Sequence, residues 1–292
     1  MIVMKAVAFA PGHISGFFEP VYINQDLTKT GSRGAGINVS LGVLSEVVAE
    51  SATRQDFEIF VNDKKSDAPV TQLALNYLIG EKPLHVVVKT RLELPIGQGF
   101  GMSAAGALSA SFALAKIVGV SNTEALKASH CAEVQLRTGL GDVFASYFGG
   151  VEIRRAAGLP PWGMIEHIPG KCDLVLCVIG KKIDTKKVLT DPTKMENIAA
   201  VGRYCTKKLL ENPSIENLFS LSQVFTKKTG LADKRVLEAI DAANHFGMAS
   251  MCMLGNSVFA AGNTDKLRQT LSLFGKVYVC TVDEQGARVL EE

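Results

Sequence analysis

The residues best suited to chemistry lie in a glycine-rich stretch, Pro95–Gly106, with the sequence PIGQGFGMSAAG. A β-branched segment over 84–94 precedes it and predicts a strand, and a long run of small residues follows it. Glycine has no Cβ, so the backbone can turn sharply and approach a ligand closely at Gly97, Gly99 and Gly101. Ser103 is the expected N-cap of the next helix, whose first turn offers free N–H groups. This order of strand, loop and helix predicts a phosphate-binding site.

Two carboxylates further along the chain suit phosphate chemistry. Mg²⁺ prefers hard oxygen ligands, and Ser103 together with Glu133, on a helix predicted over 123–135, could supply them. Asp142 ends a loop with the sequence Gly-Leu-Gly-Asp and could accept a proton from a hydroxyl group. The residues alone leave simpler roles open: an N-cap for Ser103, a solvated helix face for Glu133, and a cap of the segment 143–148 for Asp142.

Other interpretations of the glycine loop fit less well. It lacks the Gly-Lys-Ser/Thr ending of a P-loop, and no acidic residue closes a strand about 20 residues later, as a dinucleotide-binding fold requires. A glycine turn that only lets the next helix pack tightly is the remaining alternative.

The pattern Pro-x-Gly-x-Gly-x-Gly-x-Ser-Ala-Ala resembles the nucleotide loop of the GHMP kinase superfamily, with Met102 in place of the first serine of that loop. The opening Ala10–Phe18 and the glycine turn over 30–36 are most similar to the archaeal pantoate kinases, and the resemblance covers the whole chain. It implies that the chain transfers the γ-phosphate of ATP, with Mg²⁺, to the primary hydroxyl of (R)-pantoate, giving 4-phosphopantoate in archaeal coenzyme A biosynthesis. Homoserine, mevalonate or shikimate as acceptor, or a nucleotide-binding sensor without catalysis, are the alternatives.

The resemblance also assigns roles. Asp142 corresponds to the base of the family, and Ser103 and Glu133 correspond to its Mg²⁺ ligands. The ATP-binding residues are then Pro95, Gly97, Gly99, Phe100, Gly101, Met102, Ser103, Ala104 and Ala105.

Contacts to the substrates are expected from four further places in the chain. The Gly-Glu-His of sugar and mevalonate kinases is replaced by Gly-Phe-Phe at 16–18, so acceptor selectivity must differ. A carboxylate acceptor needs a cation; charge alone also allows Arg91 and Arg154, but glycine-rich loops favour Arg33 and Arg137. The full set of candidates is His13, Ser15, Arg33, Arg137, Thr138 and, in a third motif expected to line the phosphate side, Gly255, Asn256 and Ser257.

Composition narrows the class of protein. With 47% hydrophobic and 21% charged residues, the 292-residue chain predicts a soluble globular protein, and its net charge of +2 gives no general field for nucleic acid. Six cysteines without a Cys-x-x-Cys pair predict buried thiols in a reducing cytoplasm. No signal peptide is visible, and the uncharged stretch 96–115 contains too many glycines and polar residues for a membrane span. We expect a cytoplasmic enzyme that acts on a small molecule without nucleic acid or membrane, with a homodimer possible.

The elements that must position these residues predict an α+β fold. Strands and helices mix without a regular βαβ repeat. Turns are predicted at 11–16 and 31–36, a buried helix over 104–118, a hairpin over 249–261 and the last strand over 276–282. Residues 1–170 are expected to form an N-terminal nucleotide-binding domain, like domain 2 of ribosomal protein S5 by resemblance. Residues 171–292 are expected to form a ferredoxin-like sandwich.

Overall fold

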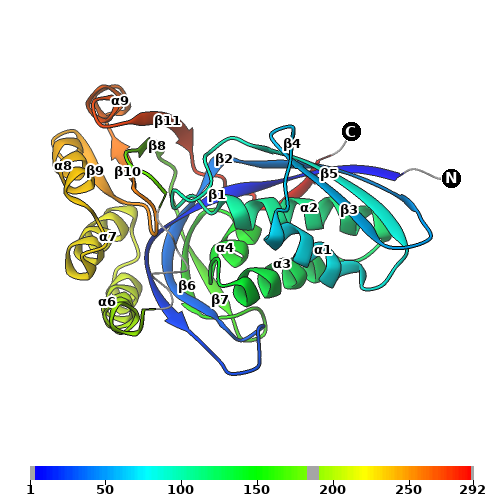
Figure 1. Ribbon diagram of the computed structural model, residues 1–292. Helices are drawn as coiled ribbons and strands as arrows, with labels where there is room; N and C mark the ends of the chain where they lie inside the picture. The colour runs from blue at the N-terminus through cyan, green and yellow to red at the C-terminus, as the bar shows by residue number, and fades with distance from the viewer. Residues whose placement is uncertain (1–3, 183–190, 291–292) are drawn as a thin grey trace.

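The computed structural model describes residues 4–182 and 191–290, and it contains a large sheet and a smaller sheet that helices cover (Figure 1). Val3, where the sequence predicts the first strand to begin, lies outside the described residues. The α+β class predicted from the sequence is confirmed.

Two long antiparallel strands, β1 (Met4–Val21) and β2 (Gly31–Ser51), form the backbone of the large sheet. The turns predicted at 11–16 and 31–36 are therefore wrong, because these two segments pair with each other as continuous strands. The register shifts between Pro11 and Gly12 and again between Ser15 and Phe17. The glycines thus serve bulges and close contacts inside a sheet, and a bulge re-aims the side chains that follow it.

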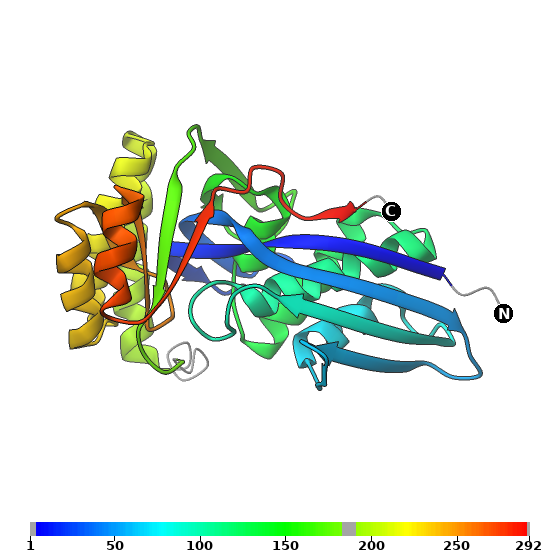
Figure 2. The ribbon, with the colours of Figure 1, turned by 90° about the horizontal axis from the view of Figure 1, so that it is seen from above.

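The remaining strands extend this sheet on both sides. The order β12-β1-β2-β5-β3-β4 includes β12 (Arg288–Leu290), β5 (Leu84–Leu92), β3 (Asp56–Val61) and β4 (Lys64–Lys65), and β6 (Val151–Ala156) and β7 (Met164–Ile168) join through β2. The prediction that 276–282 is the last strand is wrong, since β12 follows it and returns to pair with β1. Figure 2 shows this return of the C-terminal segment along β1.

Helices α1 (Pro69–Ile79), α2 (Met102–Val118), α3 (Asn122–Leu136) and α4 (Asp142–Phe148) cover one face of the large sheet (Figure 1). The predicted buried helix is confirmed as α2, whose side chains are buried nearly all the way round. Helix α3 begins with a capping box formed by Ser121 and Glu124. Within the described ranges, no helix combines the length and apolar character that crossing a membrane requires.

The second sheet has the order β11-β8-β10-β9, with all neighbours antiparallel. Its strands are β8 (Asp173–Val178), β9 (Gly247–Met251), β10 (Ser257–Gly262) and β11 (Lys276–Thr281). This is the ferredoxin-like arrangement, with α6 (Pro192–Glu211), α7 (Ile215–Thr229), α8 (Lys234–Ala243) and α9 (Thr264–Ser272) beside it. Rings from both halves meet in one core, where Phe18 and Phe225 lie 5.8 Å apart. The division between residues 170 and 171 stays a prediction.

Candidate active site

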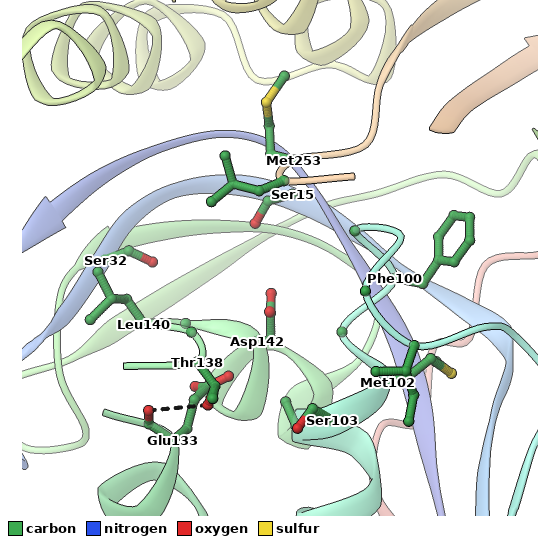
Figure 3. Close-up of a pocket in the computed structure, with 18 of the residues that line it drawn as sticks. Ser15, Ser32, Phe100, Met102, Ser103, Glu133, Thr138, Leu140, Asp142 and Met253 are labelled. Carbon is green, nitrogen blue, oxygen red and sulfur yellow. Dashed lines mark hydrogen bonds between the residues drawn. The ribbon is translucent and has the colours of Figure 1, made fainter. Parts of the chain in front are cut away.

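A pocket of roughly 500 Å³ opens where the two halves of the chain meet (Figure 3). Its wall is formed by the glycine loop with the start of α2, the end of α3 with its connection to α4, strands β1 and β2, the loop between β9 and β10, and Lys182 after β8. Sequence-predicted residues that line it are Ser15, Gly97, Gly99, Phe100, Gly101, Met102, Ser103, Ala104, Glu133, Arg137, Thr138 and Asp142. Those outside the lining are His13, Arg33, Pro95, Ala105, Gly255, Asn256 and Ser257.

The glycine loop has the backbone conformation that its composition predicts. The φ angles of Gly97, Gly99 and Gly101 are 78°, 75° and 62°, a region that side chains disfavour. Helix α2 begins at Met102 after Gly101, which caps it without a side-chain hydrogen bond. The prediction of Ser103 as N-cap is therefore wrong. Its side chain is exposed in the first turn and lines the pocket, so its hydroxyl is available to a ligand.

The three residues predicted from the third motif lie outside the pocket, and two of them, Gly255 and Ser257, contact the glycine loop. Ser257 Oγ donates to the carbonyl oxygen of Gln98 at 2.5 Å, and the Gln98 amide donates to the Gly180 carbonyl oxygen at 3.0 Å. A Cβ on Gly255 would lie 2.0 Å from the Gln98 carbonyl carbon, so only glycine fits there. The loop between β9 and β10 thus holds the glycine loop from behind, and Met253 and Leu254 of the same loop reach the pocket.

Glu133 projects from α3 into the pocket although it is almost fully buried. Its Oε2 atom has no hydrogen-bond partner among the described residues. Burial raises the pKa of Glu133 well above the ordinary range of a glutamate, and the negative charge of Asp142 raises this pKa further. An unpartnered buried carboxylate oxygen of this kind suits a bound cation.

Asp142 is the first residue of α4, whose cap is Gly141, so the alternative of Asp142 as the cap of this helix is wrong. Its side chain is 29% exposed and points into the middle of the pocket in Figure 3. Its Oδ1 atom lies 2.7 Å from Nδ1 of His13. One oxygen is therefore bound to the protein, and the carboxylate still reaches the pocket.

His13 lies behind Asp142 and is fully buried. Its Nε2 atom is 3.0 Å from Oε1 of Glu152 and 3.2 Å from Nη1 of Arg154, and these two residues form a buried ion pair. Burial lowers the pKa of His13, but its hydrogen bonds to Asp142 and Glu152 outweigh burial and raise the pKa above its ordinary value.

The candidate arginines are placed differently from one another. Arg33 is held outside the pocket, because it donates to Glu19 at 3.0 Å and to the Arg155 carbonyl oxygen at 2.9 Å. Arg137 lines the pocket and is exposed. Arg154 is buried, its Nη2 donates to Oγ of the pocket-lining Ser15 at 3.1 Å, and its Nε has no partner among the described residues.

Sequence reasoning missed several residues of this site. Phe18, Ser32, Leu140, Lys182, Met253 and Leu254 also line the pocket, and Glu152 supports it from below. One signal was available for the supporting residues: Glu152 and Arg154 alternate within the apolar strand β6, so both point to one face, and both are buried. The apolar residues of the lining come from segments that are far apart in the chain, so no spacing in the sequence identifies them.

The chain is similar to known proteins along its whole length. A family model described as the GHMP kinases N terminal domain matches residues 69–150. The pantoate kinase of Methanocaldococcus jannaschii is 32% identical over 94% of this chain and 99% of its own, and that of Methanospirillum hungatei is 33% identical over 99% and 98%. A solved structure described as a phosphotransferase related to the CoA biosynthesis pathway has a TM-score of 0.88 at 28% identity, covering 98% of both chains.

Proposed function

This chain belongs to the GHMP kinase superfamily, among the pantoate kinases, and from that membership and the site we propose that it transfers the γ-phosphate of ATP to the primary hydroxyl of pantoate. One observation carries the proposal. A single pocket joins a glycine loop at a helix start to a carboxylate held in a fixed orientation. Phosphoryl transfer needs these two parts side by side, a cradle for the phosphates and a group that orients the acceptor.

The ATP side of the pocket is the glycine loop and the first turn of α2. The free N–H groups there and the positive end of the helix dipole attract phosphate oxygens. Gly97, Gly99 and Gly101 let the backbone approach the phosphates, and Lys182 lines the same pocket from the second half of the chain. A lysine ammonium in this place can offset phosphate charge.

Ser103 and Glu133 fit a Mg²⁺ ion that accompanies ATP. Both line the pocket, and Glu133 offers a buried oxygen that has no partner within the described part of the chain. The described residues contain no cluster of three or more His, Cys, Asp or Glu side chains arranged for a metal, which agrees with an ion held mostly by phosphate and water. When bound, Mg²⁺ neutralises charge that develops on the phosphate oxygens.

Asp142 is the residue that receives the proton of the acceptor. Its carboxylate accepts the hydroxyl proton while the hydroxyl oxygen bonds to the γ-phosphorus, and the bond from that phosphorus to the bridging oxygen of ADP breaks. The products are ADP and 4-phosphopantoate, with the proton left on Asp142.

The acceptor side has the character that pantoate requires. Phe18, Leu140 and Met253 form an apolar wall for the dimethyl carbon of pantoate, which is bonded to the carbon that bears the reacting hydroxyl. The acceptor carboxylate pairs with a cation at this end, where Arg137 lines the pocket and Arg154 lies beneath Ser15 with an Nε–H that has no partner among the described residues.

The direct test is ADP release with Mg-ATP and each of pantoate, homoserine, mevalonate and shikimate. Turnover with pantoate should be at least about 100-fold above that with the other acceptors, because an acceptor that leaves a buried polar group unpaired loses about 1–3 kcal/mol. Turnover with another acceptor only would keep the reaction class and overturn the acceptor. If the protein binds ATP but releases no ADP with any of the four acceptors, the catalytic assignment is overturned.

A further inference from the structure

We propose that His13 is a positioning residue for Asp142. The His13 ring donates a hydrogen bond to one carboxylate oxygen of Asp142, and this bond directs the other oxygen toward the acceptor hydroxyl. This inference rests on the proposed function, since it assigns Asp142 to the acceptor. His13 lies outside the pocket lining and its ring is fully buried, so it acts through Asp142 and not by contact with a substrate.

The partners of the ring fix the direction of the hydrogen bond. If the ring is cationic, both nitrogens donate, Nδ1 to Asp142 at 2.7 Å and Nε2 to Glu152 at 3.0 Å. If the ring is neutral, Nε2 can accept from Nη1 of Arg154 at 3.2 Å, which leaves the proton on Nδ1. In both states Nδ1–H donates a hydrogen bond to the ionised carboxylate of Asp142, so this hydrogen bond survives a change of ring charge.

The surroundings of His13 hold the ring in one place. Its backbone N–H donates to the carbonyl oxygen of Phe100 at 3.0 Å, which ties this part of β1 to the glycine loop. The ring lies over Gly36 of β2, where a Cβ would come within 2.4 Å of Nε2. The ion pair of Glu152 and Arg154 closes the far side of the ring.

This arrangement gives Asp142 a defined geometry toward both substrates. The residue that contacts the glycine loop through its backbone also contacts Asp142 through its side chain. The distance between the bound phosphates and the proton acceptor is therefore set by one residue of β1, held through both its backbone and its side chain. Phosphoryl transfer depends on such placement, since a displacement of about 1 Å costs about 100-fold in rate.

Two substitutions separate the roles of the two ring nitrogens. The side-chain amide nitrogen of asparagine occupies the place of Nδ1, whereas that of glutamine reaches the place of Nε2. His13→Asn therefore keeps a donor toward Asp142, and His13→Gln keeps one toward Glu152. His13→Leu removes both donors at similar volume.

We expect kcat with pantoate to fall about 100-fold in His13→Leu and in His13→Gln, and to recover to within about tenfold of the wild type in His13→Asn. The Kd for ATP should change less than threefold in all three variants, because the ring does not line the pocket. Equal losses in the asparagine and glutamine variants, or a loss confined to ATP affinity or melting temperature, would overturn the positioning role.

The wild-type protein supplies a measurement that needs no variant of His13 to fold. Its proton NMR spectrum should contain a strongly downfield Nδ1–H signal from a short hydrogen bond, assigned through ¹⁵N-labelled histidine and lost in Asp142→Ala. Absence of this signal would contradict the inference even in a fully active enzyme. A wild type that does not phosphorylate pantoate would instead refute the proposed function, while the signal still tests the hydrogen bond.

Discussion

Asp142 can be tested by a substitution that keeps its shape and removes its ability to take up a proton. In Asp142→Asn the side chain still fits at the start of α4, so ATP should bind as in the wild type. Turnover should fall at least about 100-fold, the order expected for loss of a general base. Steady-state kinetics with pantoate, together with ATP binding by calorimetry, measure both quantities. Turnover like that of the wild type would remove Asp142 from the mechanism.

Arg137 and Arg33 form a matched pair of arginines, both predicted from sequence to hold the acceptor carboxylate. Arg137 lines the pocket, whereas Arg33 is engaged by Glu19 and by the Arg155 carbonyl oxygen. Arg137→Ala should raise KM for pantoate about tenfold to 100-fold, since a charge-assisted hydrogen bond is worth about 1.5–3 kcal/mol. Arg33→Ala serves as the control and should leave KM within about twofold. A larger rise in the Arg33 variant would contradict the placement of the acceptor.

At the scale of elements, the loop between β9 and β10 holds the glycine loop by packing against its backbone. Gly255→Ala would place a methyl group 2.0 Å from the Gln98 carbonyl carbon, so the glycine loop must move. We expect KM for ATP to rise about tenfold, the equivalent of about 1.4 kcal/mol, with a lower melting temperature. Kinetics at varied ATP concentration measure the effect.

Gly106→Ala is the control for that substitution. Gly106 lies inside α2, and a Cβ there meets only Thr71 at 3.9 Å and Val43 at 4.0 Å, ordinary contact distances. Alanine is favoured over glycine in a helix by about 0.5–1 kcal/mol, so this variant should be as stable as the wild type or slightly more so. A loss of ATP affinity as large as in Gly255→Ala would show that neither effect is specific to the loop contact.

At the scale of the whole molecule, the pocket draws its wall from both halves of the chain. The glycine loop precedes α2, while Met253 and Leu254 come from the second sheet region. A ligand bound there connects the two halves, so Mg-ATP at about 100 times its Kd should add about 2.7 kcal/mol to the free energy of unfolding. Thermal unfolding should show one transition that moves upward with Mg-ATP and less with ATP plus a chelator. Two transitions, of which only one moves, would contradict this connection.

Features that depend on residues close together in the chain could be predicted from the amino-acid sequence. The glycine loop is readable because its three glycines with positive φ are neighbours in the chain, and α2 because its small apolar residues leave no polar face. Asp142 stands out because glycines flank it before and after. Helices with a clear cap, such as α3 after Ser121, are set by a few adjacent residues.

Contacts between residues that are far apart in the chain could be seen only in the folded structure. The glycine-rich segments of β1 and β2 have the composition of turns, but they pair with each other as strands. The sheet satisfies backbone N–H and C=O groups that a turn would leave without partners. Arg33 donates a hydrogen bond to Glu19 because these two residues lie opposite each other on neighbouring strands. His13 and Asp142 are 129 residues apart, and their contact exists because β1, β6 and α4 pack together around one buried ion pair.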